Sequence, residues 1–274
     1  MIFFTKMQGI GNDFIIINNI DRKILYDYSK LSEYMCNRHF GIGADGVIYI
    51  EKSNTADFKM RIFNSDGSEA EMCGNGIRCF AKYLYQNKIT KKKEIDIETL
   101  AGIKNVKLIF EEEKISYVEV NMGEPCFEYS KIPVFSKEEK DFLIIDNAKV
   151  YPVSFGNPHC VKFVENVENI DIKIDGNKIE NYKYFPNKTN VEFVEIINEK
   201  EIKVRVWERG VGETLACGTG ACAAAVISQK EKGLKNEILV HLNGGILKIQ
   251  YDEKNKLVYM IGEAEEVFTG NIIR

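Results

Sequence analysis

The chain contains Arg61-Ile-Phe-Asn-Ser-Asp-Gly-Ser-Glu-Ala-Glu-Met-Cys73-Gly-Asn-Gly76 and, 144 residues later, Arg205-Val-Trp-Glu-Arg-Gly-Val-Gly-Glu-Thr-Leu-Ala-Cys217-Gly-Thr-Gly220. Both stretches begin as a strand, pass through a short polar loop and reach Cys-Gly-x-Gly, where an alanine-containing helical stretch begins. A duplicated motif with one thiol in each copy suggests a reaction that needs two thiols. Moving a proton from one face of a carbon atom to the other is such a reaction.

The similarity between the two halves extends beyond these stretches. Gly11-Asn12 matches Gly156-Asn157 at an offset of 145, so the second copy lacks one residue between this landmark and the cysteine. The register predicts two domains of one fold, residues 1–120 joined by a C-terminal strand over 263–274, and residues 121–262, with matching loops facing each other. Further matches at the 144-residue offset are Arg61 with Arg205, Phe63 with Trp207, Glu69 with Glu213, and Ala81 with Ala225.

Strands dominate the expected secondary structure. Apolar and polar residues alternate over 58–62 and 202–206, which is typical of half-buried strands. We expect two β meanders, irregular chain over 125–150, and few helices, so the predicted class is α+β. The meander strands are expected at 94–99, 103–110, 115–121, 237–242, 246–251 and 256–261, and the helices at 29–38, 75–87 and 219–232.

Composition excludes several classes of protein. The 274 residues are 45% hydrophobic and 28% charged, as in an ordinary globular protein, and the formal net charge of −4 argues against a nucleic-acid partner. No apolar stretch approaches the roughly 20 residues that span a bilayer. The first residues lack the basic region and cleavage site of a signal peptide.

The seven cysteines are an odd number, which disfavours a fully paired disulfide framework. Reduced thiols in the cytoplasm are the better interpretation. No Cys-x-x-Cys pair is present, so we expect no metal site.

Cys-Gly-x-Gly before a helix favours two kinds of chemistry. The glycines let the backbone approach a ligand closely, and the amides at the helix start bind anions. Two such helix ends on one carboxylate would stabilise an enolate-like intermediate. The same field is expected to lower the pKa of Cys73 and Cys217, so that one acts as thiolate base and the other as thiol acid.

The two copies differ at positions expected to recognise the substrate. Asn64 in the first copy occupies the place of Glu208 in the second, at the end of a strand. Glu208 suits a substrate ammonium group and the neighbouring Arg209 suits a carboxylate, while the structural alternative is a surface salt bridge. His159, in the tight loop that begins at Gly156, is expected to steer the protonation of a thiol, or else to be a structural histidine.

In its motifs the chain resembles the diaminopimelate epimerases. The motifs span almost the whole chain in the family's order, and as a set they are highly specific. They are Gly9-Ile-Gly-Asn12-Asp-Phe, Gly41-Ile-Gly-Ala-Asp45-Gly, Asn64-Ser-Asp-Gly-Ser, Cys73-Gly-Asn-Gly-Ile-Arg78, Gly156-Asn-Pro-His159, Thr189-Asn190-Val-Glu, Trp207-Glu-Arg209-Gly and Ala216-Cys217-Gly-Thr-Gly-Ala.

The resemblance implies a cofactor-independent isomerase of lysine and peptidoglycan precursor biosynthesis that interconverts L,L- and meso-diaminopimelate. It implies no pyridoxal phosphate and no metal, a cytoplasmic homodimer, and two domains, each a β-sheet wrapped around a central helix. Some members carry glutamine where this chain has Gly46, so no substrate contact is expected from that side chain.

The resemblance also assigns roles to individual residues. Cys73 and Cys217 would be the acid/base pair, with Glu208 on the amino group and His159 in support. The amides of Gly74, Asn75, Gly218 and Thr219 would hold the α-carboxylate, and Asn12, Asn64, Asn157, Asn190 and Arg209 would line the site and read the distant end of the substrate.

Three other functions stay open from the residues. A proline racemase-like enzyme would use the same two thiols but would need an apolar wall in place of the Asn/Arg cluster. A cysteine hydrolase would pair His159 with one essential cysteine and form an acyl-enzyme. A non-catalytic amino-acid-binding module would have no use for two thiols.

Overall fold

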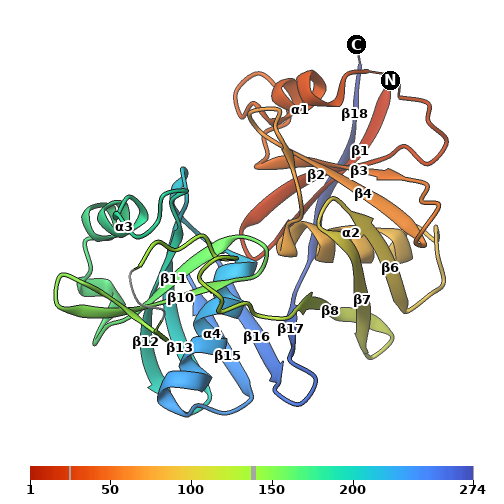
Figure 1. Cartoon of the computed structure of the whole chain (residues 1–274). Helices are drawn as coiled ribbons and strands as arrows, with labels where there is room; N and C mark the ends of the chain where they lie inside the picture. Colours follow the sequence, from red (N-terminus) through yellow and green to blue (C-terminus); the bar gives the residue numbers. More distant parts are fainter. Residues whose placement is uncertain (25, 137–139, 274) are drawn as a thin grey trace. The chain divides into compact units, whose positions relative to one another are not determined.

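The computed structural model describes residues 1–24, 26–136 and 140–273. Residues 25, 137–139 and 274, which the expected domains include, lie outside the described residues. The chain divides into two compact units, unit 1 formed by Met1–Asn121 with Ile261–Arg274, and unit 2 formed by Met122–Met260. Each unit is described by itself below (Figure 1).

Unit 1 is built from strands around one buried helix. Strands β1 and β2 pair antiparallel, β2 and β3 parallel, β3 and β4 antiparallel, and β4 then pairs antiparallel with β5 and parallel with β6. Its elements are β1 (Ile2–Gly9), β2 (Asn12–Asn18), α1 (Tyr28–Cys36), β3 (Gly46–Glu51), β4 (Phe58–Asn64), β5 (Glu69–Ala70), α2 (Gly74–Gln86), β6 (Glu94–Thr99), β7 (Gly102–Glu111), the start of β8 (Lys114–Gly123), and β18 (Glu265–Ile272).

Unit 2 repeats this order of pairing. Strands β10 and β11 pair antiparallel, β11 and β12 parallel, β12 and β13 antiparallel, and β13 pairs antiparallel with β14 and parallel with β15. Its elements are β9 (Leu143–Ile145), β10 (Ala148–Ser154), β11 (Pro158–Phe163), η1 (Val167–Asn169), α3 (Ile172–Glu180), β12 (Asn190–Asn198), β13 (Glu201–Glu208), β14 (Gly212–Thr214), α4 (Gly218–Lys232), β15 (Glu237–Leu242), β16 (Gly245–Asp252) and most of β17 (Leu257–Gly262).

The strand registers carry the same offset as the sequence. Val47 lies opposite Phe63 in unit 1, and 144 residues later Val191 lies opposite Trp207 in unit 2. Ile15 pairs with Val47, whereas its counterpart Cys160 pairs with Val191, at offsets of 145 and 144. The single-residue deletion therefore falls between β11 and β12.

One helix forms the centre of each unit. α2 contacts β1, β2, β3, β4, β7 and β18, and α4 contacts the six strands from β10 to β13, β15 and β16 (Figure 1). The segment Ala221–Gln229 of α4 is continuously buried, because its alanines let strands approach from several sides. This arrangement confirms the α+β class with sheets around central helices.

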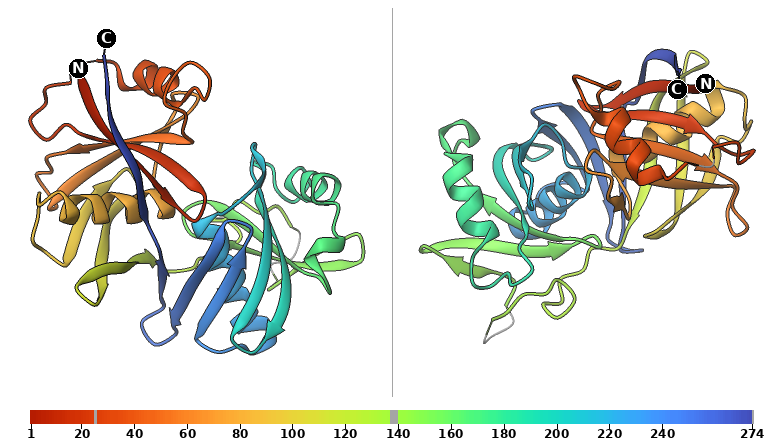
Figure 2. Two further views of the ribbon diagram at one scale, coloured as in Figure 1. Left: turned by 180° about the vertical axis from the view of Figure 1, so that it is seen from behind. Right: turned by 90° about the horizontal axis from the view of Figure 1, so that it is seen from above.

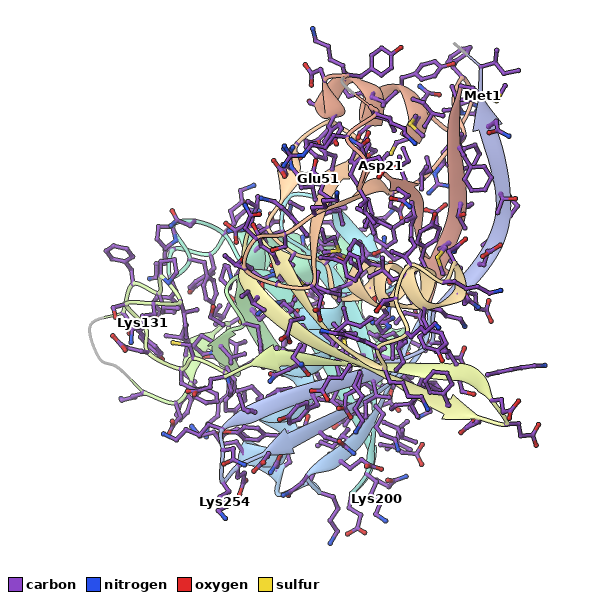
Figure 3. All side chains as sticks on the ribbon, turned by 90° about the vertical axis from the view of Figure 1, so that its right-hand side faces the viewer. Met1, Asp21, Glu51, Lys131, Lys200 and Lys254 are labelled. Atoms are coloured by element: carbon purple, nitrogen blue, oxygen red, sulfur yellow. The ribbon has the colours of Figure 1, made fainter. Side chains whose placement is uncertain are left out.

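The ends of the chain meet in unit 1. β18 pairs antiparallel with β1, so that Ile2 lies opposite Ile272, and Figure 2 shows the two strands side by side. In unit 2 the charged turn residues Lys200 and Lys254 lie at one end of the strands and point outward (Figure 3). Among the described residues, the structure contains no helix with the length and apolar character needed to cross a membrane.

Candidate active site

Cys73 is the N-cap residue of α2. Its backbone is extended, with φ −136° and ψ 120°, and its sulfur accepts a hydrogen bond of 3.4 Å from the Gly76 amide. The Cys73 carbonyl accepts the first helical bond, from Ile77, at 2.9 Å. The side chain is half-buried. The thiol therefore stands directly at the positive end of the helix dipole.

Cys217 occupies the same place at the start of α4. Its φ and ψ are −122° and 114°, its sulfur accepts a 3.4 Å bond from Gly220, and its carbonyl accepts from Ala221 at 2.9 Å. Neither of these fully described helices has an acidic residue in its first turn. Both helix starts are therefore suited to an anionic ligand such as a carboxylate.

Matched ion pairs brace the hairpins that lead to the two cysteines. In β4–β5, Arg61 donates to Glu69 through Nε at 2.7 Å and a second nitrogen at 2.9 Å. In β13–β14, Arg205 Nε donates to Glu213 at 2.8 Å. These four residues are the charged matches found in the sequence at offset 144, and they fix the loop that delivers each cysteine to its helix.

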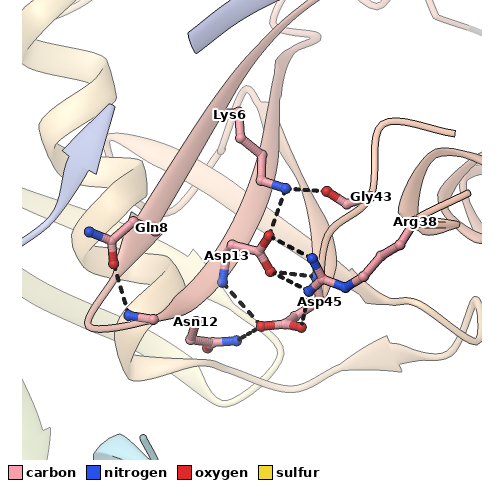
Figure 4. A network of polar contacts seen from close by, with 8 residues as sticks. Lys6, Gln8, Asn12, Asp13, Arg38, Gly43 and Asp45 are labelled. Carbon is pink, nitrogen blue, oxygen red and sulfur yellow. Dashed lines mark hydrogen bonds and ion pairs between the residues drawn. The ribbon is translucent and has the colours of Figure 1, made fainter. Parts of the chain in front are cut away.

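Asn12 lies beside Cys73 and is oriented by a carboxylate. Its Nδ2 donates to Asp45 at 2.7 Å (Figure 4). This leaves Oδ1 facing Cys73 Sγ at 3.5 Å and Asn75 Nδ2 at 3.4 Å. Oδ1 accepts a hydrogen bond from the Cys73 thiol.

Asp13 anchors the network behind Asn12 (Figure 4). Lys6 and Arg38 both pair with it, at 2.7 and 2.9 Å, and Arg38 also reaches Asp45 at 2.9 Å. Burial raises the pKa of Asp13, but the hydrogen bonds from Arg38 and Lys6 outweigh it and lower the pKa to about 2. The carboxylate therefore stays ionised and holds this loop through the acid range.

Asn157, the counterpart of Asn12, connects two other predicted residues in unit 2. Its Nδ2 donates to Thr219 Oγ1 at 3.3 Å, and its Oδ1 lies 3.1 Å from His159 Nε2. Thr219 Oγ1 in turn lies 3.5 Å from Cys217 Sγ. His159 is fully buried and its Nδ1 lies 2.7 Å from the buried carboxyl of Glu192.

The thiol of Cys217 does not have the lowered pKa that the helix start alone predicts. Burial raises its pKa well above the ordinary value, and the carboxylates of Glu208 and Glu192 raise it further, while bonds from Thr219 and Gly220 act in the opposite direction. That prediction is wrong for Cys217, because desolvation of the charged form outweighs the helix dipole.

The remaining predicted residues lie around the β13–β14 hairpin or at the end of β4. Glu208 is half-buried and accepts from Thr214 Oγ1 at 2.6 Å. Asn190 is buried and bridges two backbone segments, donating to the Pro158 carbonyl at 2.8 Å and accepting from the Arg209 amide at 2.9 Å.

The exposed guanidinium of Arg209 donates to the Asn187 carbonyl at 3.3 Å. Asn64 is exposed and bonds Ser68 at 3.0 Å. A Cβ on Gly46 would lie 2.8 Å from the Phe63 carbonyl, so a larger residue at this position would require the backbone to shift.

The structure thus groups the predicted residues within each unit. Asn12, Cys73 and Asn75 are in contact in unit 1, and Asn157, His159, Thr219 and Cys217 form one connected set in unit 2. Sequence reasoning gave no role to Asp45 or Glu192, which orient the two asparagine-centred groups. Among the described residues no cluster of three or more His, Cys, Asp or Glu is suited to a metal ion, and all seven cysteines are free.

Comparisons with solved structures identify the fold. The chain superposes on a PhzF-family phenazine biosynthesis protein from Bacillus anthracis with a TM-score of 0.73 and 18% identity, covering 100% of this chain and 99% of that one. It superposes on a hydroxyproline epimerase from Agrobacterium vitis with a TM-score of 0.66 and 13% identity, covering 99% and 90%. At these identities the similarity concerns the fold alone.

Sequence comparisons identify the family. A family model described as diaminopimelate epimerase matches residues 4–128 and 151–267. A diaminopimelate epimerase from Halothermothrix orenii is 51% identical over 279 residues, covering 98% of this chain and 97% of the relative, and one from Agathobacter rectalis is 49% identical over 281 residues, covering 98% of each. The chain therefore belongs to the diaminopimelate epimerase family.

Proposed function

We propose that this enzyme interconverts L,L- and meso-diaminopimelate by a proton shuttle between Cys73 and Cys217. One observation carries the proposal: both sulfurs cap the N-terminus of a central helix with the same geometry and the same 3.4 Å bond from the third residue of the helix. A family of epimerases needs two such groups, because the proton must leave one face of the α-carbon and return on the other.

The chemistry follows from the two helix starts. One cysteine thiolate takes the α-proton, so that the C–H bond breaks and an S–H bond forms. The electron pair moves onto the α-carboxylate, where the first-turn amides at Gly74, Asn75, Gly218 and Thr219 stabilise the added charge. The other thiol then gives its proton to the opposite face, which leaves the second sulfur as the thiolate.

Substrate recognition is assigned to the residues that differ between the two copies. Glu208 would bind the reacting amino group, and Asn64, Asn157, Asn190 and Arg209 would read the distant amino-acid end, with Asn12 next to Cys73. The exposed guanidinium of Arg209 and the exposed amide of Asn64 support contacts to a charged ligand.

The environment of His159 argues against the hydrolase alternative with Cys217. Its ring nitrogens face Glu192 and Asn157, and the ring is fully buried. A general base for a nucleophilic thiol needs to bond the sulfur directly. Among the described residues, polar contacts connect His159 to Cys217 through Asn157 and Thr219.

The enzyme's place in metabolism follows from its family. Diaminopimelate serves lysine and peptidoglycan synthesis, and we propose that this enzyme supplies it in the cytoplasm. We also propose that the enzyme acts without pyridoxal phosphate or metal. We also propose a homodimer, to be tested by the mass in solution.

Deuterium uptake at the substrate α-carbon in D2O tests the reaction. We expect uptake with the wild type, and loss of epimerisation in Cys73→Ala and in Cys217→Ala. Full epimerisation by either variant would contradict the two-thiol proposal. Retention of activity after dialysis against a chelator and a carbonyl reagent would support the absence of metal and pyridoxal phosphate.

A further inference from the structure

Glu192 is a charged residue in the middle of a buried strand of unit 2. It follows Val191 and precedes Phe193 and Val194 on β12, and all four residues are buried. Burial raises the pKa of the Glu192 carboxyl, and its pairing with His159 and the Cys160 amide act to lower it. A carboxyl in such a place is costly unless its partner compensates for the lost water.

The carboxyl packs directly against the helix start that carries Cys217. A Cβ added to Gly220 would lie 2.7 Å from Glu192 Oε1, so only glycine at this position leaves room for the carboxyl. Gly220 is also the residue whose amide bonds the Cys217 sulfur. Glu192 is thus buried against the first turn of α4, next to the residue that caps the Cys217 sulfur.

A continuous chain of polar contacts leads from this carboxyl to the sulfur. Glu192 Oε1 lies 2.7 Å from His159 Nδ1, and His159 Nε2 lies 3.1 Å from Asn157 Oδ1. Asn157 Nδ2 donates to Thr219 Oγ1 at 3.3 Å, and Thr219 Oγ1 lies 3.5 Å from Cys217 Sγ. We propose that Glu192 is a positioning residue. It fixes the donor-to-acceptor direction of these hydrogen bonds, so that every donor points toward Cys217.

The charge of the buried pair determines the direction. When the carboxyl and the ring share a proton at Nδ1, the pair has no net charge and Nε2 carries a hydrogen, wherever the shared proton resides. Nε2 then donates to Asn157, Asn157 donates to Thr219, and the Thr219 hydroxyl has its own hydrogen left for the Cys217 sulfur. This direction stabilises the thiolate.

The reverse direction requires either a net negative charge in the core or a carboxyl proton on Glu192 Oε2, which is buried and has no hydrogen-bond partner among the described residues. A ring protonated only at Nδ1 would accept from Asn157 at Nε2, and Thr219 would then accept from the thiol. Without that proton, the Glu192 carboxylate would remain ionised beside a neutral ring, with both side chains fully buried. Because an uncompensated buried charge and an unpaired buried donor both cost free energy, the first direction is favoured.

This inference deepens the proposed function, since it concerns how one of its two thiols is prepared, but its test needs no substrate. In the uniformly 15N-labelled protein, the ring nitrogens of His159 report their protonation by chemical shift. Variants His39→Gln and His241→Gln assign the three histidines. We expect Nε2 of His159 to carry a hydrogen at pH 7, and an unprotonated Nε2 would overturn the proposal.

A second measurement is the rate at which iodoacetamide alkylates Cys217. Peptide mass spectrometry follows this rate for Cys217 separately from the other cysteines. In Glu192→Gln the pair no longer favours a proton on Nε2, so we expect the rate to fall about fivefold. Removing a nearby negative charge by itself would instead raise the rate. Glu208, the other carboxylate that raises the pKa of Cys217, is unchanged in this variant.

The double variant Glu192→Gln/Thr219→Val decides whether the effect of Glu192 on the alkylation rate passes through this series of hydrogen bonds. If Glu192 acts through Thr219, then Glu192→Gln has no further effect in the Thr219→Val background. An unchanged or higher rate in Glu192→Gln, or an equal fall in both backgrounds, would overturn the proposal. Should Glu192→Gln fail to fold, the nitrogen shifts of the wild type decide alone.

Discussion

The side-chain oxygen of Asn12 lies 3.5 Å from the sulfur of Cys73, and Asp45 holds the amide in that orientation with a 2.7 Å bond. The corresponding Asn157 in unit 2 is oriented by a histidine instead of an aspartate, and it reaches its cysteine only through Thr219. The two thiols occupy matched helix caps, but different residues contact them and orient the asparagine beside each one.

The variant Asn12→Asp tests the influence of this oxygen. A negative charge in contact with Cys73, and next to Asp45, disfavours the thiolate, so the alkylation rate of Cys73 at pH 7.5 should fall about tenfold. Peptide mass spectrometry measures the rate for Cys73 separately. The control Asn198→Asp, at the exposed end of β12, should leave it unchanged. An equal rate in Asn12→Asp and the wild type would show that the contact is without consequence.

The matched glycines Gly76 and Gly220 should respond differently to alanine. A Cβ on Gly76 would meet the flexible Cδ1 of Ile48 at 3.0 Å, whereas one on Gly220 would lie 2.7 Å from Glu192 Oε1. Alanine is the better helix former, so Gly76→Ala should change stability by less than about 1 kcal/mol. Gly220→Ala should destabilise the protein by about 1–3 kcal/mol. Urea unfolding of the two variants makes the comparison, and equal stabilities would contradict the packing described.

Arg205 should contribute more to stability than its counterpart Arg61. Besides its bond to Glu213, it donates to the carbonyls of Val167 and Ile170 at 2.9 and 3.1 Å, and it is only 15% exposed. Arg205→Ala removes these three bonds from a largely buried cluster and should cost about 2–3 kcal/mol in the free energy of unfolding. Arg61→Ala, measured in the same way, serves as the matched control. A larger loss in Arg61→Ala would refute this ranking.

Asp13 should make unit 1 sensitive to strong acid. Its folded pKa of about 2 lies below the ordinary value of 3.8, so the stability it contributes is present above about pH 4 and is lost as the pH falls through 2. Asp13→Asn should therefore lower the free energy of unfolding by about 2 kcal/mol at pH 7. The difference from the wild type should shrink as the pH approaches 2. A difference that stays constant from pH 7 to pH 2 would assign the loss to packing alone.

Much of the fold could be predicted from the sequence because its signals are local and repeated. The two hairpins ending in Cys-Gly-x-Gly, the strands of both meanders, and the helices α1, α2 and α4 lie within two residues of their expected positions. α3 was not among the expected helices, and Ile170, Ile172 and Ile174 alternate with polar residues as in a strand. Tertiary packing decides there, since Gly176 lets the helix approach Trp207 so closely that a Cβ would lie 2.6 Å from the indole.

The site could be predicted in its residues but less well in their relationships. Both cysteines and the asparagines beside them carry recognisable motifs, whereas the role of Glu192 depends on the neighbouring strand β11, which brings His159 next to it. The one available signal was a glutamate within an apolar strand. The pKa of Cys217 was mispredicted because burial is a property of the folded chain and is not visible in a four-residue motif.

A sulfur atom that caps a helix cannot be modified without affecting that helix. The Gly76 and Gly220 amides each spend their first-turn hydrogen bond on a cysteine. A covalent inhibitor that reacts with either thiol would therefore also weaken the hydrogen bond that caps the helix N-terminus. The most effective reagents should carry an acceptor group beside the reactive carbon, able to take over the bond that the sulfur gives up.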